Sequence, residues 1–133
     1  MHILVLRLIT LIHVMLIIFI VCTPALKSNY LLFIHSVMIP FIAIHWVLND
    51  NTCAITAIEK KVRYMIYKNP NVLADCVTCR IIDPVYNYKN DSVKERRKFV
   101  YSTVFILWCI TLYHLFYRRR CGKIKGWQDL MRM

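Results

Sequence analysis

The sequence HWVLNDNTCAITAIEKK, at positions 45–61, is the point where the chain leaves a lipid-like environment. Most residues before it are apolar, and the residues after it become strongly basic. The four polar residues from Asn49 to Thr52 carry more hydrogen-bonding groups than hydrocarbon can satisfy, where each unpaired group costs several kcal/mol. His45 and Trp46, which stand just before them, are side-chain types enriched at the level of lipid headgroups. The sequence therefore predicts that the chain exits a membrane here.

The composition is typical of a membrane protein rather than of a soluble domain. Hydrophobic residues make up 59% of the 133 residues, and the chain has only two glycines, so one membrane-embedded domain is expected. The net charge of +11 indicates that the basic residues lie outside the apolar blocks. Such charge ordinarily anchors membrane spans at the interface, and its other counterparts are anionic headgroups, nucleic acid or an acidic protein surface.

The first apolar block runs from Ile3 to Thr23 and carries a single charge, at Arg7. At about 1.5 Å per residue, a helix of this length crosses a hydrocarbon core of about 30 Å. The arginine side chain can extend to the nearer membrane surface. A signal peptide cleaved near Thr23-Pro24-Ala25 is the alternative. We expect a first spanning helix that ends at Pro24.

A second apolar block without formal charge follows from Tyr30 to Leu48. Pro40 removes one backbone donor in its middle, so a kink is expected there. Because only the polar turn Lys27-Ser28-Asn29 separates the two blocks, they are predicted to form an antiparallel hairpin. Arg7 and the polar exit then lie on one side of the membrane and the turn on the other.

An amphipathic helix of about four turns is predicted from Ala54 to Lys68. Its apolar positions recur at helical spacing: Ala54, Ile55, Ile58, Val62, Met65 and Ile66. Glu59, Lys60, Arg63 and Lys68 fall mainly on the other face. We expect this helix to lie in the headgroup plane with its lysines toward water. Docking of the apolar face on a partner protein is the alternative.

The segment that follows this helix has no clear periodicity. Asn69-Pro70-Asn71 should end the helix, and Asp83-Pro84 indicates a turn. The residues from Val77 to Ile82 favour a short strand.

A long helix is predicted after Ser92-Val93-Lys94-Glu95, a capping-box pattern. Its apolar part, Phe99 to Tyr117, is about 28 Å long at helical rise and so nearly matches a bilayer core. Cations close both ends of this span: Arg96, Arg97, Lys98, Arg118, Arg119 and Arg120. The predicted fold is an all-α integral membrane protein with three transmembrane helices, an N-terminal hairpin plus a long C-terminal helix, and an interfacial amphipathic helix.

Three segments follow from these elements: a transmembrane hairpin at 1–48, a basic amphipathic and irregular segment at 49–91, and the long helix with its basic tail at 92–133. Three complete spans place the middle segment and the tail on opposite membrane faces. Both regions are basic, with ten lysines or arginines from Asn49 to Lys98 and six after Tyr117, so the positive-inside rule favours the cytosol for both. We favour three spans with the more basic middle segment cytosolic; the alternative is that the first two helices do not both span.

Cys76 and Cys79 form a CxxC pair, which is a possible redox couple or half of a zinc site. A zinc site needs about four ligands, and Cys53 is the further cysteine on the same predicted side, with Cys121 across the membrane. No thioredoxin-like strand and helix pattern surrounds the pair. A structural disulfide or plain thiols are the favoured interpretation, and a metal or redox catalysis the alternative. Cys22 and Cys109 fall inside apolar blocks and are best read as buried hydrophobic residues.

Histidines recur in or near the predicted spans, at His13, His35, His45 and His114. His35 and His114 are expected at similar depth, which would suit a bis-imidazole haem or a metal. The favoured interpretation is hydrogen bonding to neighbours or headgroups. No acidic residue lies inside a span, and no phosphate-binding glycine loop or nucleophile paired with a base is recognisable. We therefore expect no enzyme activity, cofactor or small-molecule substrate.

The exit stretch resembles a motif in small predicted membrane proteins of unassigned function, including ones encoded by nucleocytoplasmic large DNA viruses. The residues that carry the resemblance are His45, Trp46, Asn49 to Asn51, Cys53, Thr56, Glu59, Lys60 and Lys61. The resemblance implies a hairpin-type membrane protein of a virion's internal membrane or of a capsid. It implies no catalytic residue.

Together these patterns predict a structural protein that anchors a bilayer to a protein shell or scaffold, as a viral internal-membrane or minor capsid protein would. The expected partners are lipid and other capsid or membrane proteins, with nucleic acid a weaker candidate. The predicted interface residues are Trp46, Lys60, Lys61, Arg96, Arg97, Lys98, Arg118, Arg119 and Arg120. A membrane thiol oxidoreductase or metal protein using Cys76 and Cys79 is the alternative function.

Overall fold

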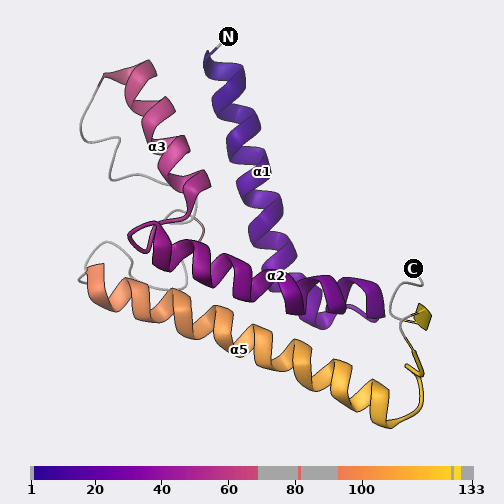
Figure 1. The fold of residues 1–133 in the computed structure, drawn as a ribbon. Helices are drawn as coiled ribbons and strands as arrows, with labels where there is room; N and C mark the ends of the chain where they lie inside the picture. The colour runs from indigo at the N-terminus through magenta and orange to yellow at the C-terminus, as the bar shows by residue number, and fades with distance from the viewer. Residues whose placement is uncertain (1, 69–80, 82–92, 127, 130–133) are drawn as a thin grey trace. The chain divides into compact units, whose positions relative to one another are not determined.

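The computed structural model describes residues 2–68, 81, 93–126 and 128–129. All regular structure within these residues is helical (Figure 1). The elements in chain order are α1 (His2–Cys22), the 3-10 helix η1 (Thr23–Ala25), α2 (Asn29–Leu48), α3 (Ala54–Tyr67) and α5 (Val93–Arg120).

Three of these helices are long and apolar enough to cross a membrane. The qualifying segments are Ile3–Ala25, Asn29–Leu48 and Lys94–Arg120. The prediction of three membrane-length helices in an all-helical fold is confirmed, and the predicted amphipathic helix is present as α3. The strand predicted at 77–82 and the capping box at Ser92 lie outside the described residues, apart from Ile81 and Glu95.

Local sequence explains where the first two helices end. Pro24 lies in η1, which tightens the last turn of α1, and Leu26 then takes an extended conformation with ψ 151°. After α2, Asp50 adopts a left-handed φ of 50°, and the Asn51 N–H donates back to the Trp46 carbonyl at 2.7 Å. This return bond closes the helix end, because aspartate and asparagine tolerate left-handed backbone better than apolar residues do. The predicted polar exit is therefore a helix cap.

The described chain divides into two compact units. One unit comprises residues 1–17 and 45–97, and the other comprises 18–44 and 98–133. Both α1 and α2 contribute to both units, since each helix passes from one unit into the other.

In the first unit, α3 packs along the N-terminal part of α1 (Figure 1). Among the residues of this unit that the structure describes, the buried ones are few and mostly polar: Leu6, His13, Thr56 and Glu59. The contact between the two helices is consequently held by hydrogen bonds as well as by apolar packing.

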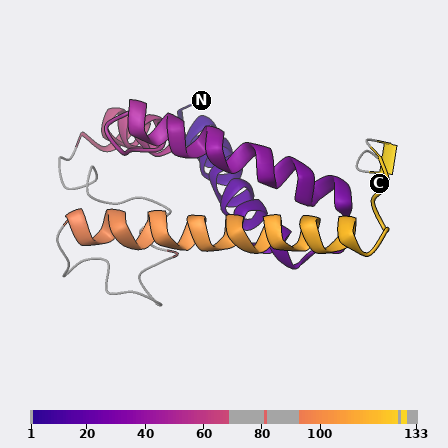
Figure 2. The same cartoon turned by 60° about the horizontal axis from the view of Figure 1, so that its bottom comes forward.

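In the second unit, residues 29–44 of α2 run alongside α5 (Figure 2). The buried stripe of α2 consists of Leu32, His35 and Ile39, which recur at the spacing of one helical face. Trp108 of α5 donates its indole N–H to the Ser36 carbonyl at 2.9 Å. Later residues of α5 therefore meet earlier residues of α2, which makes the two helices antiparallel.

Candidate functional site

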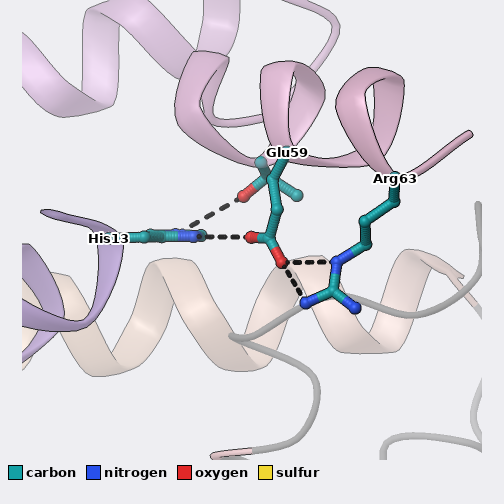
Figure 3. A network of polar contacts seen from close by, with 4 residues as sticks. His13, Glu59 and Arg63 are labelled. Atoms are coloured by element: carbon teal, nitrogen blue, oxygen red, sulfur yellow. Dashed lines mark hydrogen bonds and ion pairs between the residues drawn. The ribbon is translucent and has the colours of Figure 1, made fainter. Parts of the chain in front are cut away.

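A buried polar network joins α3 to α1 in the first unit (Figure 3). His13 Nδ1 lies 3.3 Å from Glu59 Oε2, and Arg63 donates to Glu59 Oε1 through Nε at 3.0 Å and a terminal nitrogen at 2.9 Å. Thr56 Oγ1 lies 3.5 Å from His13 Nε2. The Glu59 side chain is fully buried. This carboxylate thus accepts bonds from two different helices.

The chemistry of the partners assigns the proton positions on His13. A carboxylate only accepts, so His13 Nδ1 carries the hydrogen that points to Glu59, and a neutral ring leaves Nε2 to accept from the Thr56 hydroxyl. The carboxylate of Glu59 is balanced by the guanidinium of Arg63, which is 13% exposed. The Glu59 carboxylate and the Arg63 guanidinium thus form a charge pair, the arrangement in which a buried charge is tolerated.

Glu59 lies on the polar face of α3, as its spacing predicts, but it is buried against α1. Glu59 and Arg63 are four residues apart, so they pair on one face of α3. This face turns toward His13 of α1. The apolar side is left open, with Ile58 51% and Met65 55% exposed. The helix therefore keeps an exposed apolar surface while its charged pair holds it to α1.

His45 has a structural role at the start of α3. Its Nε2 accepts the backbone N–H of Ala54 at 3.2 Å. Ala54 is the first residue of the helix, so its N–H has no carbonyl partner within the helix. The N-cap residue, Cys53, makes no side-chain hydrogen bond that would satisfy the helix start. A histidine nine positions upstream thus caps α3 and ties its beginning to the end of α2.

In the second unit, both ring nitrogens of His35 are engaged by oxygen. Nε2 donates to the Ile20 carbonyl at 3.1 Å, and Nδ1 lies 3.0 Å from the Thr111 hydroxyl. His35 and Thr111 are both fully buried. Neither nitrogen is left to bind a metal or haem iron, so the structure does not support the His35–His114 pair; His114 instead contacts the ring of Tyr113, with centroids 6.2 Å apart.

Arg118 differs from the two arginines that follow it. Its guanidinium donates to the carbonyls of Leu26 and Lys27 and, at 2.7 Å, to Asn29 Oδ1. These oxygens belong to the turn between α1 and α2, so Arg118 binds that turn to the end of α5. Arg119 and Arg120 are exposed.

Of the other predicted interface residues, Lys60 and Lys61 lie in the middle of α3, and the rest lie near the end of α2 or the start of α5. Lys61, Arg97 and Lys98 are exposed, whereas Trp46, Lys60 and Arg96 are half-buried. The roles predicted for these residues at a membrane or partner surface stay predictions.

The cysteine hypothesis concerns mainly residues that the structure leaves out. Cys76 and Cys79 lie outside the described residues. Cys53 is a free, half-buried thiol at the start of α3, and Cys22, Cys109 and Cys121 are free and exposed. No cluster of three or more metal-ligating side chains occurs among residues 2–68, 81, 93–126 and 128–129. The alternative function as a thiol oxidoreductase or metal protein stays a prediction.

Sequence reasoning missed the partners of His13 and His35 and the separate role of Arg118. Only one signal was available, the Glu59–Arg63 spacing, which predicts a pair along α3 but not its burial.

No family model, curated protein or solved structure matches this chain.

Proposed function

We propose that this protein is a structural integral membrane protein that anchors a bilayer to a protein shell or scaffold. Its three apolar helices insert into the lipid, and the cations at the helix ends bind the headgroups and the shell. The observation that carries the proposal is helix α5. Its apolar segment is only 6% buried, and cations lie at both of its ends.

The exposed apolar surface supports the membrane part of the proposal. Only 17% of the most apolar window of each of the first two candidate spans is buried. Large apolar side chains that are more than half exposed occur on all three helices, for example Leu11, Phe41 and Phe105. Soluble monomers rarely present apolar surface so continuously, whereas lipid tails cover it at no cost.

The engaged histidines support a structural rather than a catalytic role. His13 and His35 use ring nitrogens in bonds between helices, and His45 caps a helix. Polar groups committed to such contacts hold a fold together. What these regions offer to a partner is charge at the helix ends, including Arg97, Arg119 and Arg120.

The identity of the shell rests on the resemblance of residues 45–61 to small membrane proteins of large DNA viruses. On that proposal the bilayer is an internal membrane of the virion and the shell is its capsid. In a membrane enclosed between a genome and a capsid, the basic residues on one face would bind the genome and those on the other face would bind the capsid.

The test separates membrane insertion from shell binding. Wild-type protein should resist alkaline carbonate extraction and be present in purified particles. Arg119→Gln with Arg120→Gln should resist extraction equally well, because α5 keeps its apolar length. Its incorporation into particles should fall severalfold, and the deficit should grow with ionic strength as the residual contacts are screened.

The lysine pair Arg119→Lys with Arg120→Lys is the matched control, since it keeps the charge and should restore incorporation. Extraction of the wild type by carbonate would contradict the membrane proposal. Normal incorporation of the glutamine pair at every salt concentration would leave these arginines as membrane anchors only.

A further inference from the structure

We propose a phosphate-binding site at one end of the second unit, in a pocket of about 390 Å³ lined by Lys27, Asn29, Arg118 and Lys123. The occupant is the phosphate group of an anionic phospholipid. This inference goes beyond the proposed function, which requires no specific lipid.

The pocket is strongly cationic. Three of its four described lining residues carry a positive charge, the fourth is an asparagine, and none of them is a carboxylate. Asn29 is also the first residue of α2, so the positive end of that helix dipole lies at the pocket. A volume of this size lies within the usual range of ligand sites.

Backbone geometry brings Lys123 to the pocket. Gly122 has a left-handed φ of 71°, the Gly122 N–H donates to the Arg119 carbonyl at 3.1 Å, and the Lys123 N–H donates to the Arg118 carbonyl at 3.0 Å. These two bonds form a Schellman motif, which folds the chain back over the end of α5. Lys123 is thereby held beside Arg118 rather than carried away along the helix axis.

Arg118 is held in place by the turn, and some of its N–H donors stay available for a ligand. A guanidinium has five N–H donors, and three contacts hold it to the turn, which leaves two donors for a ligand. Its fork suits phosphate oxygens, and the two lysines add mobile point charges.

The surroundings favour a lipid as the source of the phosphate. The pocket lies where α2 begins and α5 ends, at the polar limit of two candidate spans. Phe116 and Tyr117, on the last apolar turn of α5 before Arg118, are 66% and 56% exposed and can contact acyl chains. A headgroup phosphate at this level would leave its acyl chains beside these rings.

The experiment measures lipid retention by the full chain in a zwitterionic detergent, using native mass spectrometry. The probes are dioleoyl phosphatidic acid, dioleoyl phosphatidylcholine and, separately, inorganic phosphate. Wild type should retain phosphatidic acid in preference to phosphatidylcholine. Lys27→Gln with Lys123→Gln should weaken phosphatidic acid binding by about fivefold for each lysine, since a lysine near an anionic surface contributes about that factor.

Lys94→Gln with Lys125→Gln is the matched control. It removes the same charge from exposed lysines that do not line the pocket, and it should bind phosphatidic acid as wild type does. Equal weakening in both double variants would overturn the site and leave only general charge attraction. Inorganic phosphate that binds as tightly as the lipid, and depends on the same two lysines, would overturn the assignment to a lipid.

Discussion

Thr103 and Thr111 lie on the same helix, but only the hydroxyl of Thr111 reaches a buried histidine. Each hydroxyl contacts the carbonyl four residues earlier, at 2.8 Å for Thr103 and 3.1 Å for Thr111. Thr111 is fully buried and also lies 3.0 Å from His35 Nδ1, whereas Thr103 is exposed. Comparing substitutions at Thr111 and Thr103 therefore tests the hydrogen bond between Thr111 of α5 and His35 of α2.

We expect Thr111→Val to lower the free energy of unfolding by about 1–3 kcal/mol, because the isosteric valine leaves a buried ring nitrogen without its partner. Thr103→Val removes only the bond within the helix and should change stability by about 0.5 kcal/mol or less. Reversible denaturation of the detergent-solubilised protein measures both. Similar losses for the two variants would show that the hydroxyl of Thr111 does not stabilise the contact with α2.

At the scale of the element, α3 is held by charge on one side and presents an apolar surface on the other. Most amphipathic helices bury their apolar face within the protein or in lipid and leave their charges to water. Here the paired charges of Glu59 and Arg63 turn toward α1, because His13 supplies a donor within an otherwise apolar helix. This arrangement attaches the helix without using its apolar face.

Glu59→Gln should weaken the attachment of α3 to α1. The amide keeps the shape but removes the charge opposite Arg63, and hydrogen bonds to charged groups contribute about 1.5–3 kcal/mol. Hydrogen exchange of the α3 amides should therefore speed up in this variant. Glu59→Gln combined with Arg63→Gln should recover part of the protection, since it leaves no uncompensated buried charge.

Glu95→Gln is the control, because Glu95 is exposed on the first turn of α5 and its loss should leave α3 unchanged. Unaltered exchange in Glu59→Gln would mean that the buried carboxylate does not attach α3 to α1.

At the scale of the whole molecule, the proposal that all three membrane-length helices span the bilayer gives an odd number of crossings. The segment after α2 and the tail after α5 are then on opposite sides of the bilayer, although both are basic. The bonds from Arg118 to the turn at residues 26–29 agree with this order, because a hairpin turn and the end of a third span belong on one side. The segment with ten cations, rather than the tail with six, is expected to face the cytosol.

Single-cysteine variants that retain only Cys53 or only Cys121 test this topology. In sealed, uniformly oriented vesicles, a membrane-impermeant maleimide should label one of them from outside and the other only after permeabilisation. Cys121 is exposed and Cys53 half-buried, so a detergent-denatured sample provides the labelling control. Labelling of both from the same side would contradict three complete spans.

The sequence alone determined the helices and their lengths. Runs of apolar residues, Pro24 and the polar residues after Leu48 act locally, so hydropathy and helix-ending signals located the three membrane-length helices to within a few residues. Only the tertiary structure decided which polar groups these helices bury against one another. His13 and Glu59 are 46 positions apart, His35 and Thr111 are 76, and Arg118 and Lys27 are 91. Such partners share no periodicity along the chain, and the folded geometry alone brings them together.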